Sequence, residues 1–187
     1  MRGIKAGDAA SGQRGAMKQS DIPDERLPIA ALPIRPDAPI DRLLAWVVAD
    51  LQADGLRIAG FRQCDGVRLE DLITGASYPI TQSLGPGSSG CRLDPQGLAV
   101  AAAAALAALE EGPDLLLIPR FGKAEMEGEG MRAVIARACE RDVPVLVAVR
   151  SSAEPAWQAF AGGLSHWLPV EREAVTGWCR TACAERA

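Results

Sequence analysis

Four basic residues follow apolar runs that the sequence predicts to be β-strands: Arg35, Arg120, Lys123 and Arg150. The carboxyl ends of parallel strands meet at one edge of a sheet, where α/β proteins bind ligands, so we expect these side chains to converge there. Guanidinium and ammonium groups are strong partners for phosphate and other oxyanions. The sequence therefore predicts a local anion site at this edge.

The same arginines also have an ordinary interpretation. Asp37, Glu125 and Glu154 lie near them in the sequence, and surface ion pairs are common and contribute little to stability. The arginines would then be solvated or paired with these acids rather than reserved for a ligand. The residues alone leave both interpretations open.

A glycine- and serine-rich segment, residues 82–94, offers further anion-binding groups. Its backbone N–H groups, the hydroxyls of Ser88 and Ser89 and the guanidinium of Arg92 are the parts of an oxyanion cradle. Asp94, which precedes a proline, has the pattern of a helix N-cap, so a helix would begin directly after the cradle. A flexible surface loop would have the same composition.

Cysteine usage and charge exclude several classes of protein. The five cysteines are an odd set without a Cys-x-x-Cys pair, which is typical of a reducing compartment and predicts a cytoplasmic protein. Cys91 would be a reactive thiol or a soft ligand, although packing is the commoner role. The net charge of −4 gives no general basic field for nucleic acid or an anionic membrane. No apolar run reaches the ~18 residues of a membrane span.

The sequence offers no familiar catalytic or metal-binding set. His166 is the sole histidine, so no Ser-His-Asp or Cys-His arrangement is indicated, and we interpret it as structural or exposed. Cys179 and Cys183 are interpreted as two core or surface thiols in a helix. Charged residues near a predicted turn are interpreted as solvated: Asp65, Glu70 and Asp71. We therefore predict neither a metal nor a resident cofactor.

The order of apolar runs and amphipathic stretches predicts an α/β fold, with a mostly parallel sheet flanked by helices. The unalternating run Leu115–Ile118 predicts a central strand buried on both faces. Pro28 and Pro33 weaken the first strand, residues 27–34, and favour an irregular or edge position. Further strands are predicted at 144–149 and 166–170, and helices at 39–53, 95–111, 130–141, 155–160 and 172–184.

Three short segments between the first two long helices predict an antiparallel insertion. They are 57–63, 67–73 and 77–81, and the Asp-Gly and Thr-Gly pairs between them are typical of hairpin turns. Before the first strand, residues 1–26 have few large apolar side chains and are predicted to be a disordered tail. The length of 187 residues then fits a single domain over residues 27–187.

Residues 116–126 resemble the Walker B region of the small nucleoside-triphosphatases of archaea and thermophilic bacteria. The order of elements over residues 27–170 is similar as well, including the run Asp71–Gly75 in the hairpins. The resemblance implies the three-layer fold of the P-loop nucleoside-triphosphatases.

The catalytic motifs of those hydrolases are missing. The segment Pro33–Asp41 stands where they carry Gly-x-x-x-x-Gly-Lys-Ser/Thr, and it contains no glycine, lysine or serine. Prolines also remove the N–H groups that would hold phosphate. Pro119 and Arg120 occupy the positions of the acidic pair that binds magnesium and activates water. We therefore do not expect hydrolysis of ATP by the standard route.

A bacterial family of unknown function is more similar. It resembles these hydrolases without their P-loop, and its Gly-Cys-Arg-Leu-Asp-Pro and Phe-Gly-Lys-x-Glu runs are found here at Gly90–Pro95 and Phe121–Glu125. The similarity extends through Phe160–Gly163. Because members are often encoded beside molybdate-transport genes, the resemblance implies a role in molybdenum handling, with transport or cofactor proteins as partners. A tetrahedral oxyanion such as molybdate would suit the predicted edge.

The favoured hypothesis is a non-hydrolytic accessory protein that binds an oxyanion or a nucleotide phosphate at the carboxyl edge of the sheet. The expected ligand groups are Arg35, Ser88, Ser89, Arg92, Arg120 and Lys123, with Cys91, Asp94, Glu125 and Arg150 as additional candidates.

Two alternatives stay open. One is an enzyme with a rebuilt site, a nucleotide hydrolase or another phosphate chemistry, in which Lys123 and Glu125 are active. The other is an interaction module, in a homo-oligomer or a transporter complex, that exposes part of its tryptophans: Trp46, Trp157, Trp167 and Trp178.

Overall fold

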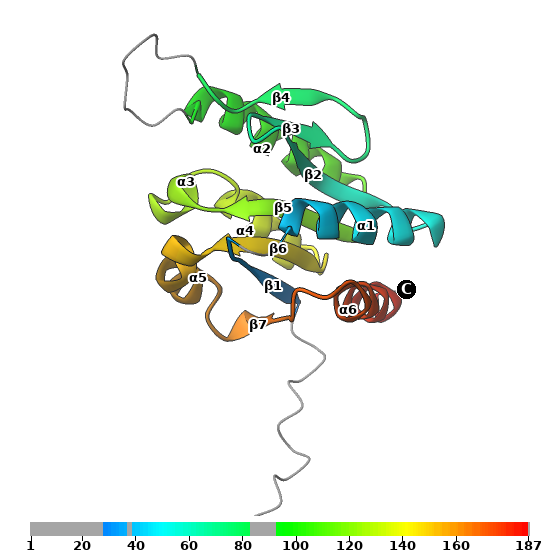
Figure 1. Ribbon diagram of the computed structural model, residues 1–187. Coiled ribbons are helices and arrows are strands. Elements are labelled where there is room, and N and C mark those ends of the chain that lie inside the picture. The colour runs from blue at the N-terminus through cyan, green and yellow to red at the C-terminus, as the bar shows by residue number, and fades with distance from the viewer. Residues whose placement is uncertain (1–27, 37–38, 83–92, 187) are drawn as a thin grey trace, which may run out of the picture.

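The computed structural model describes residues 28–36, 39–82 and 93–186, so the predicted tail lies outside the described part. Seven strands form one sheet in the order β4-β3-β2-β5-β6-β1-β7 (Figure 1). The strands are β1 (Ile29–Ile34), β2 (Ile58–Cys64), β3 (Arg68–Asp71), β4 (Ser77–Pro79), β5 (Leu115–Phe121), β6 (Val145–Arg150) and β7 (Ser165–Trp167). The helices are α1 (Ile40–Ala53), α2 (Pro95–Glu110), α3 (Lys123–Met126), α4 (Arg132–Glu140), α5 (Glu154–Ala161) and α6 (Arg172–Ala184).

Five neighbouring strands, from β2 to β7, pair in parallel, which confirms the predicted fold class. Only β3 and β4 add antiparallel pairs. The prediction for residues 57–63 was therefore wrong in part, because β2 is both the first strand of the hairpins and a parallel neighbour of β5. The Asp-Gly turn after β2 predicts its pairing with β3 but gives no information about the strand on the other side of β2.

Strand β5 lies in the middle of the sheet, between β2 and β6, as its apolar run predicts. Leu115, Leu116, Leu117 and Ile118 are all fully buried. The strand continues beyond the predicted run to Phe121, and its register with β6 shifts between Ile118 and Phe121. This irregularity surrounds Pro119, which has no N–H to donate to a neighbouring strand. It also sets the position of Arg120 at the carboxyl edge.

Strand β1 is not at the edge of the sheet, which corrects the expectation drawn from its prolines. It pairs with β6 along its length, but with β7 only over Ile29–Ala31. The carbonyl of Ala31 accepts from Leu168 N. The backbone N–H and C=O groups of every second residue of β1 therefore point toward β7, and the nitrogen of Pro33 is among them. Because β7 has already ended opposite Pro33, the missing N–H of that proline costs no ladder hydrogen bond.

Helices cover both faces of the sheet and complete three layers. One apolar cluster joins buried residues of α2, α4 and α5 to Ile29 and Ala31 of β1. A second cluster joins α1 and α6 to Ala30 and Leu32 of the same strand. Alternate residues of β1 thus face opposite helix layers. Among the described residues, no helix has the length and apolar character that a bilayer crossing requires.

Two local predictions about turns and caps are confirmed. Asp65 and Gly66 both have positive φ, 53° and 69°, and Val67 N donates to Cys64 O at 3.2 Å, as in a tight hairpin turn. Asp94 caps α2, and its carboxylate accepts from Gln96 N at 3.0 Å. These residues fix the hairpin and the start of α2 on two sides of the candidate site.

Candidate anion-binding site

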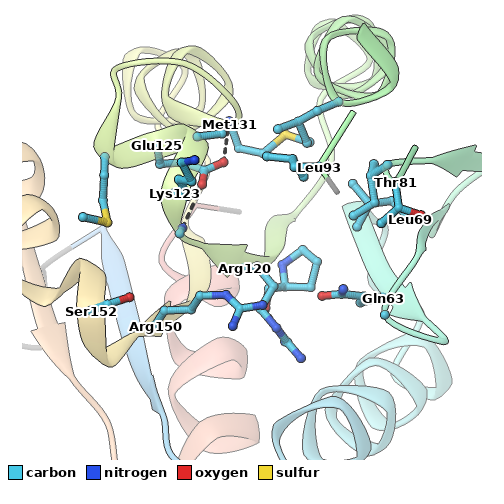
Figure 2. A pocket seen from close by; sticks show the side chains of 17 residues that line it. Gln63, Leu69, Thr81, Leu93, Arg120, Lys123, Glu125, Met131, Arg150 and Ser152 are labelled. Carbon is cyan, nitrogen blue, oxygen red and sulfur yellow. Dashed lines mark hydrogen bonds between the residues drawn. The ribbon is translucent and has the colours of Figure 1, made fainter. Parts of the chain in front are cut away.

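A cavity of about 500 Å³ opens beyond the carboxyl ends of β5 and β6 (Figure 2). Its walls come from the β2–β3 hairpin, the segment after β4, the first turns of α2 and the segment that follows Ile118. This is the edge at which open α/β sheets bind ligands. It is also the edge for which the sequence predicts an anion site.

Arg120 reaches the cavity from the end of β5, with its side chain 19% exposed. Its Nη1 donates to the carbonyl of Pro119 at 2.6 Å, and its Nη2 donates to Oδ2 of Asp41 at 2.7 Å. Asp41 lies in the first turn of α1 and was not among the acids expected to pair with the arginines. A guanidinium carries five N–H donors, so these two contacts leave further donors for a ligand.

Arg150 reaches the same cavity from the end of β6, the next strand of the sheet. Within the described part of the chain, its guanidinium has no ion-pair or hydrogen-bond partner. Figure 2 shows the Arg150 and Arg120 side chains in the same part of the cavity wall. Two positive charges in one concave site repel each other, and an anion between them removes that repulsion.

Gly122 makes room for the Arg150 side chain. A Cβ atom at this position would lie 3.1 Å from Cδ of Arg150, which is closer than a comfortable van der Waals contact. The glycine of the Phe-Gly-Lys run therefore leaves space for the Arg150 side chain at the cavity. Alanine at Gly122 would require the Arg150 side chain to shift by a few tenths of an ångström.

Lys123 is at the rim of the cavity, with a side chain 61% exposed. Its Nζ lies 3.9 Å from Oε1 of Glu127, the residue that caps the carboxyl end of α3. Exposed pairs of this kind are worth little, so the ammonium group can turn from Glu127 to a bound anion at small cost.

Glu125 lines the cavity but its carboxylate is engaged by the backbone. Its Oε2 accepts from Gly122 N at 2.8 Å and its Oε1 accepts from Met131 N at 3.0 Å. The side chain is almost fully buried, and Arg132 Nη1 donates to the Glu125 carbonyl at 3.1 Å. This carboxylate holds the segment Gly122–Met131 in shape, which is a structural role that the sequence did not indicate.

The remaining predicted ligand residues do not line this cavity within the described structure. Arg35 is exposed after β1, and Asp94 is occupied as the cap of α2. Ser88, Ser89, Cys91 and Arg92 lie outside the described residues, so the glycine-rich cradle stays a prediction.

The cavity has an apolar side and an amide that the sequence did not single out. Leu69, Ile80, Leu93 and Leu98 line it, and Figure 2 shows Leu69 and Leu93 on the side away from Arg120 and Arg150. Gln63, at the end of β2, also lines it, and its buried Oε1 has no hydrogen-bond partner among the described residues. Because these residues come from three separate segments, only the folded hairpin and α2 bring them together.

Other reactive groups are away from this site or inert. Among the described residues, no three His, Cys, Asp or Glu side chains gather closely enough to hold a metal ion. Asp71 is buried rather than solvated. Its Oδ1 accepts hydrogen bonds from Ile73 N and Thr74 N, which take the place of water. Burial raises the pKa of the Cys183 thiol to about 11 and lowers the pKa of His166. Neither group is therefore charged at neutral pH.

The tryptophans differ in exposure. Trp157 is fully buried against Phe121 and Phe160, whereas Trp46 and Trp167 are about two-fifths exposed. Arg42 lies over the ring of Trp46, with its Cζ 4.4 Å from the ring centroid. Trp46 already has a cationic neighbour within the chain, so its exposure does not by itself call for a partner protein.

Comparison with known sequences places the chain in a family. A family model described as "Protein of unknown function (DUF2478)" matches residues 29–178. The chain belongs to the DUF2478 family. The match covers every strand and ends within α6, so the DUF2478 region includes all the cavity residues named above. The expected membership of a family of unknown function is confirmed, while the resemblance to archaeal nucleoside-triphosphatases stays a prediction.

A curated protein is also similar to this DUF2478 chain. It is the Molybdenum import ATP-binding protein ModC 2 of Bradyrhizobium diazoefficiens, 38% identical over 161 residues. The alignment covers 81% of this chain but 18% of that protein, so the chain spans less than a fifth of its relative's length. No solved structure matches the chain.

Proposed function

We propose that this DUF2478 protein binds an oxyanion, either inorganic or as the phosphate of a nucleotide, in the cavity at the carboxyl edge of the sheet. The observation that carries the proposal is the pair Arg120 and Arg150, which line one cavity from neighbouring strand ends. Charge-assisted hydrogen bonds from guanidinium groups are among the stronger polar contacts available to a protein. Lys123 at the rim adds a third cation.

The local charge of the cavity supports this proposal against the acidic background of the chain. The net charge is −4, whereas three basic side chains and one carboxylate line the cavity: Arg120, Lys123, Arg150 and Glu125. Both oxygens of that carboxylate accept backbone N–H groups. A concave wall concentrates the field of the basic groups on an entering anion.

We propose further that the bound anion is not hydrolysed. The loop after β1 carries Pro36 and Pro39, which have no N–H for a phosphate. Arg120 occupies the strand end where the resembled hydrolases carry a carboxylate, and Glu125 is held by two backbone N–H groups at 2.8 and 3.0 Å. Among the described residues that line the cavity, no carboxylate is left to activate water.

The biological setting that we propose is molybdenum handling, as an accessory protein. The support is the similarity to a protein named for molybdenum import, together with the gene association implied by the resemblance stated above. Molybdate is a tetrahedral oxyanion, which is the chemistry that an arginine pair recognises. Proteins of molybdenum transport or cofactor assembly are the proposed partners.

Titration calorimetry on the full chain tests the binding proposal, with molybdate, tungstate, sulfate, ATP and GTP as probes. We expect saturable heat with at least one probe, and a loss of about tenfold or more in affinity in Arg120→Ala and in Arg150→Ala. Arg57→Ala is the matched control. Arg57 is an exposed arginine directly before β2, at the amino ends of the parallel strands and away from the cavity at their carboxyl ends. No heat from any probe with a folded sample would refute the proposal.

A phosphate-release assay with ATP and GTP tests the non-hydrolytic part. We expect no release above a protein-free control. Turnover that disappears in Lys123→Ala, with thermal unfolding unchanged, would instead establish the enzyme alternative.

A further inference from the structure

On the basis of the anion site proposed above, we propose that the ligand is an organic phosphate with a flat heterocyclic body, rather than a bare inorganic oxyanion. The phosphate lies between Arg120 and Arg150, and the body lies along the apolar wall formed by Leu69, Ile80, Leu93 and Leu98. Gln63 contacts a polar edge of the heterocycle.

The size of the cavity is the first support. A tetrahedral oxyanion has four oxygen atoms and fills about 120 Å³, if each oxygen takes the ~30 Å³ of a water molecule. The cavity has about 500 Å³, which falls in the range of roughly 300–1,000 Å³ found for small-molecule sites. An inorganic anion would leave most of this space to water.

The composition of the wall is the second support. The four aliphatic side chains named above line the cavity together with Met131, and Figure 2 shows Leu69 and Leu93 on the side away from the arginines. An inorganic oxyanion gains nothing from such a wall. A flat ring that covers about 100 Å² of apolar surface gains at least about tenfold in affinity. The division into a cationic side and an apolar side fits a ligand with two unlike parts.

The carboxamide of Gln63 is the third support. Its Oε1 is buried without a hydrogen-bond partner among the described residues, and the side chain lines the cavity. Figure 2 shows this carboxamide pointing from β2 toward Arg120. A half-turn about the last side-chain torsion exchanges the oxygen and the NH₂ group, and a ring N–H or amino group of a ligand that contacts the carboxamide satisfies the oxygen. Unpaired buried acceptors are costly and are usually satisfied in a working state.

The location differs from the phosphate loop of the hydrolases that the sequence resembles. That loop follows the first strand, and none of the described residues between β1 and α1 lines this cavity. The cavity is instead enclosed by β5, β6, the β2–β3 hairpin and the start of α2. The site proposed here is therefore built from different segments.

Calorimetry on the full chain with matched probes tests the inference. The organic phosphates are AMP, GMP, UMP and FMN, and the inorganic probes are phosphate and molybdate. We expect at least one organic phosphate to bind about tenfold or more tightly than either inorganic anion. Arg150→Ala should weaken both kinds of probe. Gln63→Leu should weaken the preferred organic phosphate several-fold and leave phosphate binding unchanged, whereas Gln52→Leu, on exposed α1 surface, should change neither.

The outcomes separate this inference from the proposed function. If molybdate or phosphate binds as tightly as every organic phosphate, the anion site stands and the inference is overturned. It is also overturned if Gln63→Leu, shown to be folded by its thermal transition, binds the preferred organic phosphate as well as the parent chain. If no probe of either kind binds, the proposed function itself fails.

Discussion

The Nη2 atom of Arg120, at the end of β5, donates a 2.7 Å hydrogen bond to Oδ2 of Asp41 in the first turn of α1. The two residues are 79 positions apart in the chain. The contact joins the central strand to the helix that follows the first strand. It holds the guanidinium at the cavity and at the same time offsets part of its charge.

Replacement of Asp41 by Asn should therefore increase the affinity of the cavity for anions. The substitution removes a carboxylate that competes with the ligand for Arg120, and we expect a gain of about three- to tenfold in the calorimetric association constant. Asp41 is 53% exposed, so the pair contributes about 1 kcal/mol or less to stability. Asp54→Asn, which disrupts the Arg180 pair at the other end of α1, is the control. Equal anion affinity in both variants would contradict the prediction.

Replacement of Glu125 by Gln should destabilise the fold by about 1–3 kcal/mol in urea unfolding. The buried carboxylate accepts from Gly122 N and Met131 N with separate oxygens, and a carboxamide places an NH₂ group against one of these donors. Glu127→Gln provides the comparison, because Glu127 is 60% exposed, and its change should stay within about 0.5 kcal/mol. A Glu125→Gln protein as stable as the parent would show that the backbone contacts matter little.

Two glycines in helices should respond to alanine with opposite sign. A Cβ atom at Gly97, in α2, would lie 2.0 Å from the carbonyl oxygen of Pro79, so Gly97→Ala must push α2 away from β4 and should destabilise by more than about 1 kcal/mol. Gly177, in α6, has no atom within 4 Å of such a Cβ. Gly177→Ala should stabilise by about 0.5–1 kcal/mol through helix propensity. Thermal or urea unfolding of both variants checks the pair, and destabilisation by Gly177→Ala would contradict it.

The single histidine should give the stability a pH dependence near neutrality. Burial lowers the pKa of His166, whereas an unfolded histidine has a pKa of about 6.5. Below that pH His166 binds a proton in the unfolded chain but stays neutral in the folded chain. The free energy of unfolding therefore falls as pH decreases. Urea midpoints at pH 7.5 and 5.5 measure this fall. It should be smaller in His166→Gln, and an equal fall in both proteins would assign it to another group.

At lower pH the protonation of paired carboxylates determines how the stability changes. Hydrogen bonds from Arg172, Arg62 and Arg137 lower the pKa values of Asp50, Glu70 and Glu110 respectively. Their contribution to stability is present above the unfolded pKa values of about 4 and is lost as pH falls through the lower folded values. A second decrease in the urea midpoint is therefore expected below about pH 4. Its size should shrink in 1 M salt, which screens exposed pairs.

Local chemistry made much of the fold predictable. Asp94 followed by proline marked the start of α2, and Asp65-Gly66 marked the hairpin, because cap and turn conformations depend on a few adjacent residues. The apolar run Leu115–Ile118 identified the central strand for a similar reason, since burial on both faces leaves no polar alternation. In each case the deciding residues are neighbours in the sequence.

The candidate site was less predictable because its contacts are between distant segments. The strand-end rule brought Arg120 and Arg150 together, but it gave no sign that Asp41 would be the partner of Arg120. Nor did it indicate that Glu125 would turn inward to the backbone, or that Gln63 would face the cavity from β2. Each of these depends on packing between elements, which a one-dimensional pattern does not contain.

The carboxylate of Glu125 fastens both ends of the segment Gly122–Met131 by hydrogen bonds of 2.8 and 3.0 Å. That part of the cavity wall is therefore formed during folding, and an arriving ligand does not have to wait for it to close. Association with this wall should be a single fast step whose rate depends on electrostatic steering and falls as ionic strength rises.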